Sequence, residues 1–314
     1  MTGPAIDDRY AVHGCVHDGA HGARGPRPDV PDTPLTWLTI GLPTMASLLV
    51  VSLRRQGGRS FTARCQWPRL HPLNERVAAV VHHPLIMVET TRQLARAVEL
   101  HHLAVAGPPR PPLEPVSVRL GVHPRGRPTE RGSATDVEAR VVLSDLPSPR
   151  TGPPASCRVT AEFLLHGVAF ASCTMRLTRP GCAAAARAEA VAPPRLSYPS
   201  AAAVGAAHDP DVLVARTPQG RLVIAPRDPG HPVLLPGRPA RMPAPAVLEA
   251  ARQAALLCSG MTSAAVTGLR VDLHAPVPPC GACVDVAGEV GGARFLVTDA
   301  GRTAAAGTVS LLRP

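Results

Sequence analysis

The feature that most constrains this chain is a charged phrase that occurs twice. ETTRQLA begins at Glu89 and EAARQAA begins at Glu249, so the copies are 249 minus 89, or 160, residues apart. Glu, Arg, Gln and the final Ala occupy the same places in both copies. Each copy lies in an apolar stretch, where charged side chains are seldom buried unless they are paired. This repeat predicts two copies of one structural plan.

The patterns around the two phrases repeat as well. In the first half, strand-like segments 45–53 and 60–67 precede a helix predicted over 85–102, and further strands are predicted at 115–122, 135–143, 157–165 and 168–177. In the second half, DVLVAR and RLVIAP precede a helix predicted over 245–259, and strands are predicted at 264–274, 283–289, 293–298 and 303–312. Two strands, a helix and four strands, twice over, indicate an internal duplication.

The segments outside these patterns differ in composition. Residues 1–36 are rich in Gly, Pro, Asp and His without periodicity, so we expect a flexible N-terminal extension that folding does not require. GCAAAARAEAVAPPR, from residue 181, is a low-complexity stretch and predicts an Ala/Pro-rich linker over 181–197. The expected domains are therefore 37–180 and 198–314, and a chain of 314 residues can bury two cores.

A long helix between a starting hairpin and a run of antiparallel strands is the element order of the hotdog fold, in which a curled sheet wraps one central helix. The expected class is α+β, with tandem hotdog domains forming an intrachain pseudo-dimer. We expect the two helices to be related by an approximate twofold axis, with the sheets continuous across the interface.

The repeated phrase places polar side chains on one face of each helix. Glu89, Arg92, Gln93 and Arg96 follow the spacing i, i+3, i+4 and i+7, and Glu249, Arg252 and Gln253 repeat it. A polar stripe on a buried helix must face a partner or a cleft. Three interpretations stay open. Two are structural: a Glu–Arg pair within the helix, or a polar contact between the two helices across the domain interface. The third is a Glu that transfers a proton beside an Arg that binds an anionic group such as phosphate.

Composition excludes several classes of function. The chain has no Lys, and its net charge of +10 comes from scattered Arg; with 3% aromatic residues it lacks a base-stacking platform, so we expect no nucleic-acid binding. The apolar run 42–53 is too short to span a bilayer, and Asp7 and Asp8 stand where a secretion signal would be apolar. We expect a cytoplasmic protein that does not bind membranes.

The cysteines and histidines predict neither a metal site nor a cofactor. Eight cysteines lack the dense spacing of a disulfide scaffold, and CGAC, at 280–283, is a single CxxC in a segment that resembles a turn entering a strand. The histidines form no HxxxH or comparable cluster. We therefore expect reduced thiols.

Four segments carry a family resemblance: HHPLIMVETTRQ at 82–93, PAPAVLEAARQAA at 243–255, QWPRLHPL at 66–73 and HAPVPPC at 274–280. Together they resemble the A-factor biosynthesis hotdog family (AfsA-like) of actinobacterial γ-butyrolactone synthases, over nearly everything from residue 40 onward. The resemblance implies an enzyme that transfers a β-ketoacyl group from acyl carrier protein to a hydroxyl of dihydroxyacetone phosphate, a step towards a butyrolactone signal.

The resemblance also implies site residues and partners. Glu89, Glu249 and Arg252 are the implied catalytic residues. Because the residues that flank the two copies differ, we further hypothesise that Glu89 transfers a proton and Arg252 binds the phosphate, with Glu249 orienting Arg252. The expected substrate-binding residues are Arg92, His82, His83, Arg241, Gln93 and Gln253. An acidic carrier protein would be attracted to a chain of charge +10. We expect a monomeric pseudo-dimer or a homodimer.

One departure from the family keeps alternatives open. Where the family has an Asp-His-Val-Pro-Gly-Met run before the second helix, this chain has ARMPAPA at 240–246, so Ala240 and Arg241 replace the Asp-His pair. A hotdog thioesterase or dehydratase acting on acyl thioesters is one alternative. The other is a non-catalytic member that binds an acyl ligand or a regulator.

Overall fold

Alternation of buried and exposed side chains builds the long strands. In the computed structural model, β3 (Ser60–Trp67) and β7 (Thr135–Ser144) bury every second residue against a core, and their intervening residues are mostly exposed. This period of two is what a sheet with one covered face requires. The structure describes residues 32–68, 71, 75–76, 80–103, 110–123, 134–146, 154–180, 195–261 and 264–312.

The first half contains one long helix and most of its strands in a single sheet. Its elements are β1 (Thr33–Pro34), β2 (Val50–Arg55), β3, the short pair β4 (Glu75–Arg76) and β5 (Val80–Val81), α1 (Pro84–His102), β6 (Glu114–Val122), β7, β8 (Ser156–Leu165) and β9 (Val168–Thr178). A 3-10 turn, Met45–Ser47, precedes β2.

The second half repeats this order with shorter starting strands. Two 3-10 turns, Ala201–Val204 and Asp209–Asp211, precede β10 (Val214–Arg216), β11 (Leu222–Ile224), α2 (Ala244–Ser259), β12 (Ala265–Leu273), β13 (Cys283–Glu289), β14 (Gly292–Asp299) and β15 (Arg302–Leu312). The observed bounds of α1 and α2 extend the predicted ones by one residue at the N-terminal end.

The strand order of the sheet is the same in both halves. Within the described residues the 13-stranded antiparallel sheet runs β1-β2-β3-β7-β8-β9-β6-β12-β15-β14-β13-β11-β10. Reading inward from each edge, β2-β3-β7-β8-β9-β6 corresponds strand for strand to β10-β11-β13-β14-β15-β12. The two runs meet where β6 pairs with β12, with Leu120 opposite Leu269. This β6–β12 pairing is the seam between the halves.

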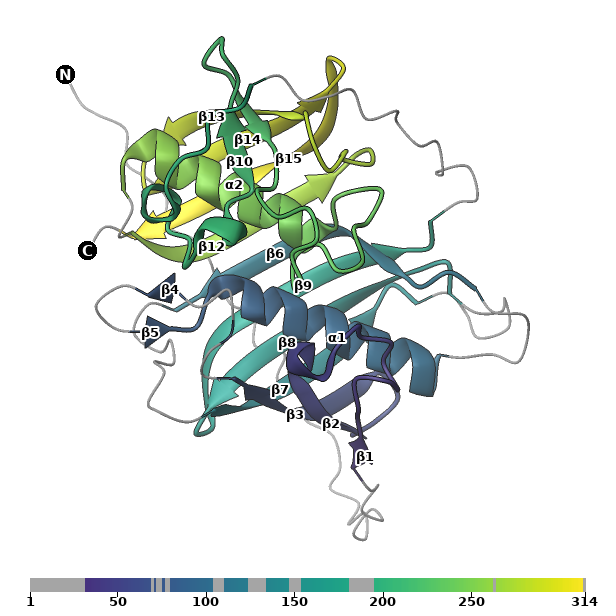
Figure 1. The fold of residues 1–314 in the computed structure, drawn as a ribbon. Coiled ribbons are helices and arrows are strands. Elements are labelled where there is room, and N and C mark those ends of the chain that lie inside the picture. The colour runs from purple at the N-terminus through teal and green to yellow at the C-terminus, as the bar shows by residue number, and fades with distance from the viewer. Residues whose placement is uncertain are drawn as a thin grey trace, which may run out of the picture. The chain divides into compact units, whose positions relative to one another are not determined.

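Each helix packs on its own half of the sheet (Figure 1). Pro84 occupies the first turn of α1, where a missing N–H costs nothing, and α2 ends at Gly260, whose φ of 68° suits a left-handed cap. α1 contacts β2, β6, β8 and β9, whereas α2 contacts mainly β12, β13 and β14 and also reaches β6 at the seam. The two helices also contact each other.

The fold begins earlier than residue 37, where the sequence places its start. Thr33 and Pro34 pair with β2 as β1, and Leu35 is buried in the core. The last residues assigned to the extension therefore belong to the sheet and core. Residues 1–31 and 181–194, which hold the rest of the predicted extension and most of the linker, lie outside the described residues.

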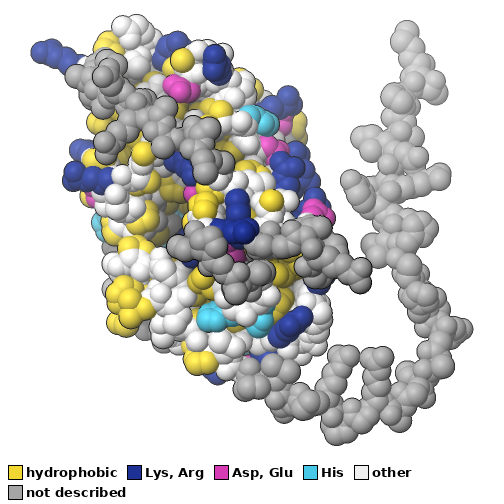
Figure 2. Space-filling model, turned by 90° about the vertical axis from the view of Figure 1, so that its right-hand side faces the viewer, with side chains coloured by type: hydrophobic (Ala, Val, Ile, Leu, Met, Phe, Trp, Pro, Cys, Tyr) yellow, Lys and Arg dark blue, Asp and Glu magenta, His cyan; other side chains and the backbone are white. Residues whose placement is uncertain are grey.

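The surface carries no single basic patch on the face drawn in Figure 2, because Arg side chains are interspersed there with acidic and hydrophobic ones. Among the described residues, no helix has the length and apolar character needed to cross a membrane.

Candidate functional site

Glu89, Arg92 and Gln93 form a hydrogen-bonded unit, here called the first clamp. Arg92 donates from Nε to Glu89 Oε2 and from Nη2 to Glu89 Oε1, both at 2.7 Å. Gln93 Nε2 donates to the same Oε1 at 2.9 Å. The Glu89 carboxylate raises the pKa of Arg92, which outweighs the lowering effect of burial. The fork of the guanidinium matches the carboxylate, so this pair is held in one geometry.

Glu249, Arg252 and Gln253 form the second clamp in the same geometry. Arg252 donates to the two Glu249 oxygens at 2.8 and 2.7 Å, and Gln253 Nε2 donates to Glu249 Oε1 at 2.8 Å. Arg252 also donates to the backbone oxygen of Gly205 at 2.9 Å. The repeated sequence phrase is therefore a repeated hydrogen-bond network.

The glutamine of each clamp anchors the chain that enters the starting strand. Gln93 donates to Ser47 O and accepts from Leu49 N, at 2.7 and 2.9 Å. Gln253 does the same with Asp211 O and Leu213 N, both at 2.8 Å. These bonds satisfy backbone groups that would otherwise be buried without partners. Both glutamines thus act structurally, whatever else the clamps do.

The two clamps differ in exposure. The side chains of Arg92 and Glu89 are 36% and 12% exposed, whereas those of Arg252 and Glu249 are 1% and 3% exposed. Part of the first clamp is therefore open to solvent. The second clamp is sealed within the described structure.

His83 connects the two halves at the second clamp. As the N-cap of α1, its Nδ1 accepts a hydrogen bond from Leu85 N at 3.1 Å. Because Nδ1 accepts, the neutral ring carries its proton on Nε2, which lies 3.4 Å from Glu249 Oε2. Both side chains are buried. The first half therefore supplies a histidine to the carboxylate of the second.

His82 and His71 lie in the interior as well. His82 Nε2 is 2.7 Å from Thr135 Oγ1, and its ring packs edge-on against Trp67. Burial lowers the pKa of His71 to about 4, with Glu89 opposing that shift and His82 and His231 adding to it. His231 bonds the Asp211 carboxylate at 3.0 Å. The buried surroundings of His71 therefore favour its neutral form.

The first clamp opens into a cavity of about 560 Å³ between the halves. Its polar lining includes Glu89, Arg92, Arg96, Glu114 and Arg241, the last contributed by the second half. Its walls are rich in proline and aliphatic side chains, among them Ile40, Leu42, Pro43, Leu113, Val116, Leu234, Met242, Pro243, Pro245 and Val277. A charged rim over an apolar wall suits an amphipathic ligand.

The predicted site residues therefore divide into two groups. Glu89, Arg92 and Arg241 line this cavity. The described lining does not include Gln93, His82, His83 or the three residues of the second clamp. Arg96 and Glu114 line the cavity but had no predicted role; the i+7 position of Arg96 on the polar stripe was the signal for it.

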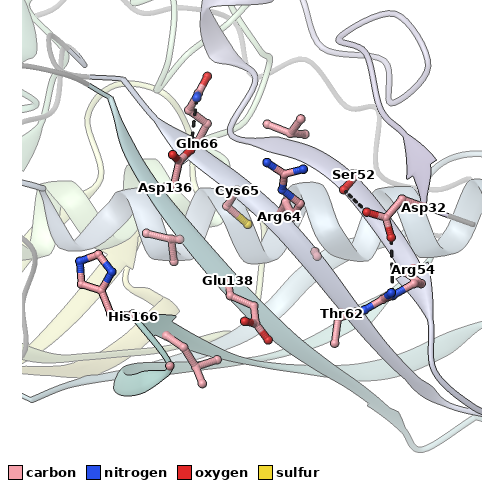
Figure 3. Close-up of a pocket in the computed structure, with 15 residues that line it drawn as sticks. Asp32, Ser52, Arg54, Thr62, Arg64, Cys65, Gln66, Asp136, Glu138 and His166 are labelled. Atoms are coloured by element: carbon pink, nitrogen blue, oxygen red, sulfur yellow. Dashed lines mark hydrogen bonds and ion pairs between the residues drawn. The ribbon is translucent and has the colours of Figure 1, made fainter.

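A second depression, of about 510 Å³, lies on the outer face of β2, β3 and β7 (Figure 3). Its charged side chains are largely occupied with neighbours: Asp32 contacts Ser52 and Arg54, and Gln66 bonds Asp136. Figure 3 shows these residues on one side of the sheet and a helix on the other. It shares no lining residue with either clamp.

Three of the described thiols, Cys157, Cys173 and Cys280, have raised pKa values and so show no activation. Burial raises the pKa of Cys157 to about 11 and that of Cys173 to about 12, which keeps both protonated. Burial also raises the pKa of Cys280, the first cysteine of CGAC. In the described part of the chain, no group of three or more His, Cys, Asp or Glu side chains is arranged to hold a metal ion.

Comparison with known families identifies the first half. Residues 38–179 match the family model AfsA, the A-factor biosynthesis hotdog domain. This segment belongs to the A-factor biosynthesis hotdog family. The match confirms the family predicted from the sequence, and with the antiparallel sheet around the helices it confirms a hotdog fold. The AfsA match ends at residue 179, just before the predicted linker.

Solved structures similar to this chain were also found. A proposed thioesterase from Novosphingobium aromaticivorans is 15% identical, with a TM-score of 0.45, covering 83% of this chain and 98% of that one. The dehydratase-cyclase domain of ambruticin biosynthesis is 18% identical, with a TM-score of 0.48 and coverages of 85% and 95%.

The dehydratase domain of PpsC from Mycobacterium tuberculosis, in complex with C12:1-CoA, is 13% identical, with a TM-score of 0.47 and coverages of 85% and 99%. Likenesses of this strength say nothing about substrate or reaction. No curated protein matches the sequence significantly.

Proposed function

We propose that this protein is an acyltransferase that moves a β-ketoacyl group from acyl carrier protein to a hydroxyl group of dihydroxyacetone phosphate. The observation that carries the proposal is the cavity, in which the Glu89 carboxylate meets an arginine-rich rim and an apolar wall. The wall suits an acyl chain, and the rim suits a phosphorylated acceptor. Membership of residues 38–179 in the AfsA family supports this choice.

Among the hydrogen bonds between described residues, Glu89 keeps one acceptor position for a substrate. Oε1 accepts from both Arg92 and Gln93, and Oε2 accepts from Arg92. A carboxylate has about four acceptor sites, so these contacts leave one on Oε2. At Glu249 the matching position on Oε2 faces His83. The residue at the corresponding place before α2, 160 positions after His83, is Pro243, which lines the cavity.

The proposed reaction uses this carboxylate as a proton carrier. Glu89 takes the proton of the acceptor hydroxyl while the hydroxyl oxygen attacks the thioester carbonyl carbon. A C–O bond forms, the C–S bond breaks, and the proton passes to the departing thiolate of the carrier. The products are an ester and a free carrier thiol, so no oxidant or reductant is needed.

Glu249 and Arg252 belong to the proposed catalytic set through the second clamp. We propose that Glu249 and His83 form a buried acid–base pair, with Arg252 holding the carboxylate in place. Arg252 already donates to Glu249 and to Gly205. The phosphate-binding role that the sequence assigns to Arg252 therefore stays a prediction, and the cavity arginines are better placed for it.

The His83–Glu249 pair favours the second candidate function, a dehydratase or thioesterase acting on acyl thioesters. A buried histidine beside a carboxylate is a common acid–base unit, and it can serve an internal proton transfer or activate water without any phosphate. Dependence on the acceptor separates this candidate from the transferase.

We further propose that the two halves are tandem hotdog domains, joined by a linker over 181–197 and packed as a pseudo-dimer. The first begins at β1 and ends near residue 180, and the second spans 198–314. The repeated strand order and the β6–β12 seam support this arrangement. A monomeric pseudo-dimer suffices for the proposed site, because both contributors to the cavity come from one chain.

The proposed function is tested with purified protein and a β-ketoacyl thioester on acyl carrier protein. Thioester consumption is measured with and without dihydroxyacetone phosphate, and the ester is detected by mass spectrometry. We expect consumption to require the acceptor, and Glu89→Gln to reduce turnover roughly a hundredfold or more. Glu138→Gln, on the outer sheet face, is the matched control. Equal consumption without the acceptor would reject the transferase and favour a thioesterase.

A further inference from the structure

The arginines in and beside the cavity are not equally balanced by carboxylates. Arg92 pairs with Glu89, and Arg241 pairs with Glu114 across the two halves. Arg96 Nη1 lies 2.8 Å from Glu99 Oε2, but Arg179 Nη2 lies 3.0 Å from the other oxygen of the same carboxylate. Two guanidinium groups therefore share one negative charge beside the cavity.

Glu99 cannot compensate both cations. Its carboxylate is buried and also accepts from Leu113 N at 3.3 Å. Arg179 is directed into the fold, where its Nε donates to the backbone oxygen of Pro154. Arg96 is the member of this group that lines the cavity, with 29% of its side chain exposed. Within the described residues, one carboxylate thus balances two arginines, and Arg96 is the one that presents positive charge to the cavity. Partial exclusion of water there strengthens its attraction for an anion.

Two further arginines converge on the same space. Arg92 is one turn before Arg96 on α1, at the i, i+4 spacing that places side chains on one face. Arg241 reaches the cavity from the second half, and its pair with Glu114 is exposed on both sides, at 34% and 42%. Exposed ion pairs contribute little free energy, so Glu114 can turn to water when a stronger anion arrives.

The charge balance indicates the class of ligand. With Glu114 turned away, the set consists of Arg92, Arg96, Arg179 and Arg241 against Glu89 and Glu99, which leaves two net positive charges. A phosphate monoester carries close to two negative charges at neutral pH and has three terminal oxygens for forked donors. A carboxylate has one charge and two oxygens, and a phosphodiester has one charge.

We propose that Arg96, with Arg92 and Arg241, forms a subsite for a phosphate monoester in this cavity. The assignment rests on the proposed function for the identity of the ester, which would be the acceptor. The donor side offers a different source of phosphate, the diester of a pantetheine arm, and the two sources differ in charge.

The test is titration calorimetry of the full chain with glycerol 3-phosphate, glycerophosphocholine and acetate as probes of monoester, diester and carboxylate. We expect the monoester to bind best, Arg96→Gln to weaken it at least tenfold, and Arg96→Lys to fall between. Arg158→Gln is the control, because Arg158 forms an exposed pair with Asp145 away from the cavity. Arg241→Gln provides a second, exposed position whose replacement leaves the core intact.

Three results would overturn the subsite: acetate binding as tightly as the monoester, equal weakening by Arg158→Gln, or unchanged binding in both the Arg96→Gln and Arg241→Gln proteins. Tighter binding of the diester would overturn the monoester assignment and give the subsite to the donor arm. Because binding is measured without turnover, retained monoester binding with no acceptor-dependent reaction would reject only the transferase.

Discussion

Arg92 and Arg252 each pair with the glutamate three residues earlier, but Arg92 is partly exposed and Arg252 is buried. This difference predicts unequal contributions to the free energy of unfolding. Arg252→Met leaves the buried Glu249 charge without its guanidinium, so we expect a loss of about 3–5 kcal/mol in unfolding free energy. Arg92→Met removes a pair that is open to water, so we expect a loss of about 1 kcal/mol or less. Urea denaturation of the two variants measures the difference, and equal losses would contradict it.

His71 predicts acid sensitivity at the residue scale. Its folded pKa, lowered to about 4 by burial, lies below its ordinary value of 6.5. As pH falls from 6.5 towards 4, the unfolded chain takes up a proton that the folded chain refuses, so stability declines across that window. The full shift corresponds to about 3 kcal/mol.

His71→Gln should reduce the decline in unfolding free energy between pH 7 and pH 4.5, measured by urea titration at each pH. His123→Gln, which alters an exposed histidine, should leave the decline unchanged. The same pH dependence in wild type and His71→Gln would show that other groups cause it.

The residues of each clamp could be predicted from sequence, because i, i+3 and i+4 spacing on a helix is a local property. Glu89, Arg92 and Gln93 bond as that spacing indicates. The contact between His83 and Glu249 could not be predicted, because it joins residues 249 minus 83, or 166, positions apart and depends on how the halves pack. The sharing of Glu99 by Arg96 and Arg179 could not be predicted for the same reason.

At the scale of elements, periodicity located both helices and most of the long strands to within a residue or two. The predicted strand 45–53 was wrong at its start, because Met45–Ser47 forms a 3-10 turn and β2 begins at Val50. The long strands alternate clearly, and Pro84 and Gly260 mark helix ends. The start of the fold was harder to predict from the sequence. β1 has two residues, too few to show a period of two, so Leu35 gave no sign that it enters the core. The order of strands within the sheet could not be predicted from the sequence either, since β6 lies beside β9 and β12 rather than β7.

The strands of both halves form one sheet joined at the seam. This predicts that one half does not fold as a stable monomer without the other. Residues 32–180 without the second half would expose the edge of β6 and the apolar face that meets α2. Unpaired edges invite association, so we expect this fragment to dimerise or aggregate, as measured by light scattering. The full chain should unfold in one transition by calorimetry. A monomeric, folded fragment would contradict the prediction.

The seam also bears on how the two clamps came to differ. In an assembly of two identical chains, a substitution appears at both sites at once, so a histidine that seals one carboxylate would seal the other. Within a single chain, position 83 can be histidine while position 243 is proline. Covalent union of the halves thus lets the two sites diverge, so that one can bury its carboxylate beside a histidine while the other stays open to a ligand.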